Sequence, residues 1–233
     1  MTHLDGNKLD LLWDFDDPAA SEKRLREAAI QAYGVMADEL RTQIARALGL
    51  QGRFAQALTL LEGISTNDPV VQQRLALERG RVLNTSGDIG PAISEFQEAY
   101  RLNADAFLTV DAIHMLAMTD MAQANLWYER GIEMLQHAHD PRMRRWEGSL
   151  RNNRAWQLAD DGNLEAALAA FCEAEEWFRQ QGNDRQILIA RWSVAHVLRR
   201  LGRVKEAREI LLDLKNHGEP DTFVDEELAL LGD

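Results

Sequence analysis

Apolar residues recur along this chain at intervals of three and four positions, with polar residues between them. This spacing places the apolar side chains on one face of an α-helix. No stretch shows the sustained alternation of β-branched residues that is typical of a half-buried strand. We therefore predict an all-α fold in which helices are joined by short turns.

One phrase recurs within this pattern: a glycine turn, an apolar residue, an alanine and, four positions later, a large apolar residue. The clearest copy runs from Gly162 to Phe171. Five copies align on their alanines, which are Ala57, Ala92, Ala124, Ala167 and Ala207. Twelve positions earlier, in the preceding helix, each copy has another small residue: Ala45, Gly80, Ala112, Ala155 and Ala195.

These columns have a packing explanation. Small residues that face each other let two antiparallel helices approach closely, and large neighbours fill the space beside them. The turn glycine is expected to take the left-handed conformation that ends the first helix. The third copy has Thr119 in place of this glycine.

The set of columns, with Asp68-Pro69 at the end of the first copy, resembles the tetratricopeptide repeat. The resemblance implies an all-α, right-handed superhelix, a solenoid of antiparallel helix pairs, and we expect one solenoid domain overall. The longer intervals before the last two copies, and Asn152-Asn153, are similar to the kinesin-light-chain style of repeat. The expected segments are an acidic N-terminal segment at 1–17, an N-terminal helix at 18–37 that starts at Asp17-Pro18, five repeats at 38–218, and a C-terminal capping helix at 219–233.

The capping helix has two faces in the sequence. Its apolar stripe consists of Val224, Leu228 and Leu231, which would cover the last repeat. Its other face is expected to carry the acidic run from Asp225 to Glu227.

The resemblance also implies that the first helix of each repeat lines an inner groove. Fifteen positions adjoin the small and large columns on this face, and they hold several arginines, two tryptophans, asparagines and no carboxylate. Thr42, Leu77, Thr109, Ile113 and Leu116 are also among them. The candidate groove residues are Arg46, Arg74, Arg81, Asn84, Asn152, Trp156, Trp192, His196 and Arg199. Such residues suit a peptide or protein segment that is acidic or ends in a carboxylate. In the alternative interpretation, both tryptophans are core residues between repeats and the arginines pair with local Asp or Glu.

Charge and composition restrict the partner. A formal net charge of −12 argues against nucleic acid and against anionic membranes as the main partner. The single cysteine fits a reducing compartment, and neither a secretory signal nor a membrane span is visible, so we expect a soluble, cytoplasmic protein.

Catalytic and metal motifs are missing from the sequence. We find no phosphate-cradling glycine loop, no nucleophile elbow and no zinc-protease motif. His137, His139 and Asp140 are expected to form a solvated helix end, and Cys172 to be a buried, inert thiol. The sequence therefore predicts a scaffold that binds a protein segment, with no catalysis, cofactor or metal. The alternative is a sensor or assembly module whose groove or end is occupied by its own acidic tail or by a second subunit, as in a homodimer.

Overall fold

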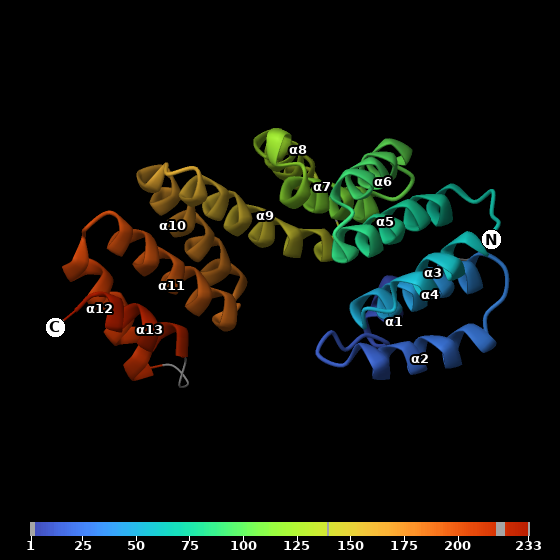
Figure 1. Cartoon of the computed structure of the whole chain (residues 1–233), viewed down its shortest axis with the longest axis horizontal. Helices are drawn as coiled ribbons and strands as arrows, with labels where there is room; N and C mark the ends of the chain where they lie inside the picture. The colour runs from blue at the N-terminus through green and yellow to red at the C-terminus, as the bar shows by residue number, and fades with distance from the viewer. Residues whose placement is uncertain (1–2, 139, 218–221, 233) are drawn as a thin grey trace. The chain divides into compact units, whose positions relative to one another are not determined.

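The computed structural model describes residues 3–138, 140–217 and 222–232. All regular elements in these residues are helices (Figure 1), so the all-α prediction is confirmed. None of the described helices is both long enough and apolar enough to cross a membrane. The helices are α1 (Gly6–Asp10), α2 (Pro18–Ile30), α3 (Val35–Leu50), α4 (Phe54–Glu62), α5 (Pro69–Ser86), α6 (Ile89–Leu102), α7 (Ala106–Thr119), η1 (Met121–Gln123), α8 (Ala124–Gln136), α9 (Pro141–Asp160), α10 (Leu164–Gln181), α11 (Asp184–Arg200), α12 (Val204–His217) and α13 (Thr222–Leu230).

The chain divides into two compact units, Met1–Arg130 and Gly131–Asp233. In the first unit, α3 packs against α4 and α5, and α5 packs against α6 and α7. In the second unit, the neighbouring pairs are α9 with α10, α10 with α11, α11 with α12, and α12 with α13. The organisation as one solenoid domain stays a prediction.

Each of the five sequence copies corresponds to two successive helices. These are α3 and α4, α5 and α6, α7 and α8, α9 and α10, and α11 and α12. A short connection joins the two helices of each copy, and the chain reverses its direction there. The wider sequence intervals in the second unit come from longer helices, since α9 has 20 residues and α10 has 18.

The repeated columns form contacts within helix pairs such as α5 with α6 and α9 with α10. The alanines of the second helices are between 0 and 2% exposed, and Phe96 and Phe171 are completely buried. In the first helices, Ala45, Ala112, Ala155 and Ala195 are also completely buried. A Cβ atom added to Gly80 would lie 2.5 Å from the Phe96 ring, closer than two carbon atoms can pack. The small residues are therefore required by the approach of their partner helix.

The turns confirm the role assigned to glycine. Gly87 and Gly162 have φ angles of 96° and 79°, in the left-handed region that L-residues avoid. The third copy ends its first helix differently, because Thr119 is still helical and Asp120 follows with a φ of −90°. The Asp120 carboxylate accepts hydrogen bonds from Gln123 (2.8 Å) and from the Trp127 indole (3.1 Å). These side-chain bonds hold the turn that a glycine holds elsewhere.

The N-terminal helix begins as expected and ends earlier. The Asp17 side chain accepts a hydrogen bond from the Ala20 amide, and Pro18 occupies the first helical turn. The helix stops at Ile30 instead of continuing towards residue 37. Gly34, with a φ of 58°, then turns the chain directly into α3, so the first helix of the first repeat begins at Val35 instead of 38.

Replacing Gly80 with alanine should destabilise the protein by about 1–3 kcal/mol, because Phe96 must shift to admit the added methyl group. Gly90 is the matched control, since it also lies in a helix and a Cβ there would meet nothing within 4 Å. Urea unfolding of both variants checks this expectation. A Gly80→Ala protein as stable as Gly90→Ala would contradict the close-packing explanation.

Candidate functional site

The predicted groove positions of the first unit lie on α3, α5 and α7, which are neighbours. Many of them are not available to a ligand, because Thr42, Leu77, Thr109, Ile113 and Leu116 are at most 2% exposed. Their polar atoms are used within the protein; the Thr42 hydroxyl, for example, donates to the Glu39 carbonyl oxygen. The candidate side chains Arg46, Arg74, Arg81 and Asn84 are partly buried.

Arg74 is engaged in an internal ion pair. Its Nε donates to Oε1 of Glu39 over 3.1 Å, and Glu39 is only 1% exposed. The Leu4 amide donates to the other carboxylate oxygen over 2.6 Å. For Arg74 the structure therefore agrees with the alternative interpretation, a pairing with a local acid.

Arg81 is at the centre of a larger ionic network. Its Nη1 donates to Oε1 of Glu78 over 2.7 Å, and its Nη2 donates to Asp111 on the next first helix. Gln43 also donates to Oε1 of Glu78, over 3.1 Å. Burial by itself would lower the pKa of Arg81, but Asp111 and Glu78 outweigh it and raise that pKa. Arg81 thus stays charged and is held in a fixed position.

Arg46 differs from the other two arginines. Within the described residues its guanidinium takes part in no hydrogen bond or ion pair, and its neighbours are aromatic rings. It lies 5.3 Å from the ring centre of Trp13 and 5.2 Å from that of Phe15, and these two rings are stacked 4.9 Å apart. Burial lowers the pKa of Arg46, and the positive charge of Arg81 lowers it further. An arginine nevertheless remains protonated in a protein, so this is a charge without a bonded counter-ion.

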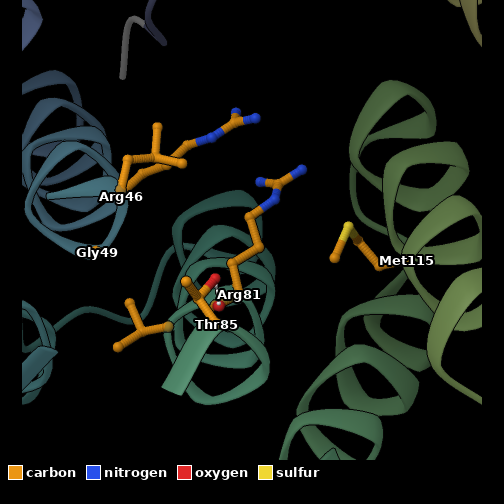
Figure 2. Close-up of a pocket in the computed structure, with 7 residues that line it drawn as sticks. Arg46, Gly49, Arg81, Thr85 and Met115 are labelled. Atoms are coloured by element: carbon orange, nitrogen blue, oxygen red, sulfur yellow. Dashed lines mark hydrogen bonds between the residues drawn. The ribbon is translucent and has the colours of Figure 1, made fainter. Parts of the chain in front are cut away.

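The two guanidinium groups adjoin a cavity of about 190 Å³. Figure 2 shows Arg46 extending from α3 and Arg81 from α5 towards the same region, with Met115 of α7 facing them. The lining consists of Arg46, Gly49, Leu50, Arg81, Val82, Thr85 and Met115. Asn84, in the last turn of α5, is not part of it.

The second unit holds the other candidate residues in an aromatic cluster. The Trp156 ring centre lies 6.1 Å from that of Trp192 and 5.5 Å from that of His196. Trp156 also packs edge-on against the buried Phe171, at 5.0 Å. The Asn152 side-chain oxygen is buried and has no hydrogen-bond partner among the described residues. Both tryptophans are half-buried, so they contribute to packing and still reach the surface.

Helix α13 lies on this cluster. The Trp192 indole donates to the Phe223 carbonyl oxygen over 3.1 Å, and the two rings meet at 6.2 Å. Glu227 accepts hydrogen bonds from Arg199 Nε over 2.6 Å and from His196. Burial would raise the pKa of Glu227, but the hydrogen bonds from Arg199 and His196 outweigh it and lower that pKa.

These contacts correct the expected placement of the acidic run. Glu227 is only 4% exposed and lies with Val224 on the packed side of α13, not on the outer face. The physical reason is that His196 and Arg199 supply donors to the carboxylate, which compensates for its loss of water. Asp225 stays outside, where it pairs with Lys215 over 2.7 Å.

Cys172 is also placed differently from expectation. It is exposed on α10, because the neighbouring Phe171 takes the inward position and successive helical residues point in different directions. Partial burial and the nearby Glu175 raise the pKa of the thiol, which keeps it largely protonated at neutral pH. His139 lies outside the described residues, and those residues contain no cluster of His, Cys, Asp and Glu that could hold a metal ion.

Several residues that contact the candidate arginines were not predicted from the sequence. Glu78 lies three positions before Arg81 on one helix, a spacing that could have indicated their pairing. Asp111 contacts Arg81, and Trp13 and Phe15 contact Arg46, from other segments of the chain. No spacing in the local sequence predicts these contacts.

Replacing Glu227 with glutamine should loosen α13, because Arg199 and His196 lose the carboxylate that they hold. Amide hydrogen exchange in residues 222–230 should accelerate by about tenfold or more at neutral pH. Glu226→Gln is the matched control, since Glu226 is exposed on the same helix. Equal exchange in the two variants would show that the carboxylate does not hold the helix.

No protein-family model matches the chain, and no curated protein matches it either. Solved structures do. The apo form of RapI superposes with a TM-score of 0.72 at 12% identity, over 97% of this chain and 70% of that chain. BtubC (BKLC) from P. vanneervenii gives a TM-score of 0.63 at 15% identity, over 91% of this chain and 94% of that one. A tetratricopeptide repeat protein from Parabacteroides merdae gives a TM-score of 0.57 at 16% identity, over 97% of this chain and 83% of that one. With the repeated columns and helix pairs, these likenesses show that the chain has the fold of the tetratricopeptide-repeat proteins.

Proposed function

We propose that this protein is a non-catalytic scaffold that binds a peptide or protein segment on the face formed by α3, α5 and α7. The observation that carries the proposal is the Arg46 guanidinium, which has five N–H donors and no acceptor among the described residues. A ligand carboxylate would supply that acceptor. The fit is to an acidic or carboxylate-ended segment, and the net charge of −12 disfavours nucleic acid. The single cysteine suits action in the reducing cytoplasm.

Arg46 is also the residue on which the proposal can be tested cleanly. Removing Arg81 would leave the buried Glu78 and Asp111 without their cation, which costs about 3–5 kcal/mol. Lost binding in such a variant could then reflect unfolding. Arg46 forms no ion pair among the described residues, so Arg46→Gln leaves none of their acids without its bonded cation and should fold normally.

Selection from a random peptide display library on the immobilised protein tests the scaffold function. We expect enriched sequences to share an anionic position and to bind Arg46→Gln at least about tenfold more weakly, because a charge-assisted hydrogen bond is lost. Arg101→Gln, which removes a surface arginine on α6, should bind them as the unaltered protein does. The proposal fails if no peptide is enriched, or if Arg46→Gln retains the same peptides.

A second function is favoured by the contacts of α13. We propose as the alternative that the chain is a sensor or assembly module in which α13 occupies Trp192, His196 and Arg199 until another segment, or the tail of a second subunit, replaces it. Glu227 on His196 and Arg199 is the supporting observation. The Glu227 carboxylate of α13 occupies the position on His196 and Arg199 that the carboxylate of an external ligand would take.

A labelled peptide of residues 219–233 tests this alternative. The binding partner in this test is the Glu227→Gln protein, whose own tail is loosened. The peptide with the natural Glu227 should bind it at least about tenfold more tightly than a second peptide in which Glu227 is replaced by glutamine. Fluorescence anisotropy measures both affinities, and the unaltered protein should bind weakly because its site is filled. If hydrogen exchange shows a released tail and neither peptide binds, α13 is a fixed cap and not an exchangeable ligand.

A further inference from the structure

The first unit has a second concave surface, a groove between α2 and α4. Both helices pack on α3, which contributes Arg41 and Leu48 to the lining. Arg26 of α2 forms one wall, and α4 forms the other. The groove has a volume of about 470 Å³, and no carboxylate of the described residues lines it. It shares no lining residue with the cavity beside Arg46, so it is a separate surface.

The wall formed by α4 is small and uncharged. It includes Ala55, Thr59 and Gly63, all exposed, which lie four positions apart on one helix face. We call these positions, two before, two after and six after the repeat alanine, the outer row of a copy. In every other copy the outer row has at least one charged residue. Small side chains let the backbone of another helix approach closely, so the outer row of the first copy can accept a second helix.

The arginines at the groove are incompletely paired. Arg26 and Arg53 bind the two oxygens of a single carboxylate, Glu22, each over 2.7 Å. Arg41 has a contact of 3.4 Å with Asp38, which is long for a charge-assisted hydrogen bond, and its other amino group donates to a backbone carbonyl oxygen. Three arginines are thus paired with two carboxylates, and a partner that brings carboxylates would complete the pairing.

The remaining charged residues of α2 and α4 do not line the groove. They are Lys23, Arg24, Glu27 and Glu62. With them included, the two helices and the three groups Arg41, Arg53 and Asp38 have five cations and four carboxylates. The surroundings of the groove are therefore positive in a chain whose formal net charge is −12.

Helix α10 of the second unit has an outer row with the complementary chemistry. Glu165, Ala169 and Glu173 are exposed there, and the two carboxylates are about 12 Å apart along the helix with a small residue between them. The Glu173 side chain is 70% exposed and lies 3.7 Å from Arg151, which already binds Glu147 over 2.7 Å. Glu165 forms no ion pair among the described residues. Two acids share one arginine here, the reverse of the arrangement beside the groove.

The outer rows of the other copies match the groove less well. Arg130 in the third copy and Lys205 in the fifth would bring a cation to the arginines of the groove. In the second copy, Glu98 is already bonded twice by Arg101, over 2.6 and 2.7 Å. Among the five copies, α10 therefore has the outer row whose charges are all negative and incompletely paired.

We propose that the outer row of α10 in one copy of this protein packs into the α2–α4 groove of a second copy, with Ala169 against Thr59 and the two glutamates on the groove arginines. The inference does not rest on the scaffold function, because none of these residues lines the cavity beside Arg46. The two surfaces differ, so the contact is heterologous and either closes into a ring or continues as a chain. A contact about two helical turns long is small, so the association is weak and reversible.

Sedimentation equilibrium of the full-length protein tests the association from about 5 to about 500 µM, the range expected for a small interface. The average mass should rise with concentration, and it should rise less at about 0.5 M salt, because the ion pairs are screened. Thr59→Trp fills the groove and Ala169→Arg places a cation in the α10 row, so each variant should stay monomeric. Ser94→Trp and Glu209→Arg, at the equivalent exposed positions of α6 and α12, are the matched controls and should associate as the unaltered protein does.

An equimolar mixture of the two blocked variants distinguishes this contact from others. Thr59→Trp retains its α10 row and Ala169→Arg retains its groove, so the mixture should form pairs although neither variant associates alone. The pairs should not grow further, because both surfaces left at their ends are blocked. Circular dichroism should show equal helix content in both variants, since both substituted positions are exposed.

A monomer at every concentration would overturn the proposal and would leave the groove to a different partner. Association that persists in Thr59→Trp or in Ala169→Arg would also overturn it, and so would a mixture of the two variants that stays monomeric. The display-library selection addresses the scaffold function separately, because peptides that need Arg46 should bind Thr59→Trp as they bind the unaltered protein. Either inference can therefore fail while the other stands.

Discussion

The contact between a small residue and a large one across each helix pair is the constraint on which the rest of the structure depends. Gly80 lies so close to Phe96 that even a methyl group would overlap the ring, and Ala155 and Ala167 are completely buried beside Phe171. Such close approach fixes the direction of each helix, because the small positions leave only one arrangement that fills space. Positions outside these columns are then free to vary.

In the first unit, positions of α3, α5 and α7 form an ionic network of three arginines, Arg46, Arg74 and Arg81, with three buried acids, Glu39, Glu78 and Asp111. Arg74 and Arg81 are each bonded to buried acids, whereas Arg46 packs on two aromatic rings and forms no hydrogen bond or ion pair among the residues described. The N-terminal segment contributes these rings, and Trp13 is anchored by a hydrogen bond to Gln43. The segment therefore has a structural role besides its acidity, since its rings hold the Arg46 guanidinium in position.

In the second unit, corresponding positions are covered by the chain itself. Trp192, His196 and Arg199 contact α13 through an indole donor and a carboxylate. In each unit an arginine on the first helix of a pair thus binds an acid from another helix, Asp111 of α7 in the first unit and Glu227 of α13 in the second.

The sequence by itself determined the all-α class, the helix pairs and the small-to-large columns, because these depend on spacings within a few residues of one another. It also placed Asp17 and Pro18 at a helix start and the glycines at the turns, where local backbone conformation decides. The tertiary structure alone decided which arginine, among the described residues, packs on aromatic rings instead of pairing with an acid, and where Glu227 lies. Those outcomes depend on Asp111, Trp13 and α13, which are distant in sequence from the residues that they contact. Contacts between distant segments do not produce a regular spacing, so the sequence pattern cannot predict them.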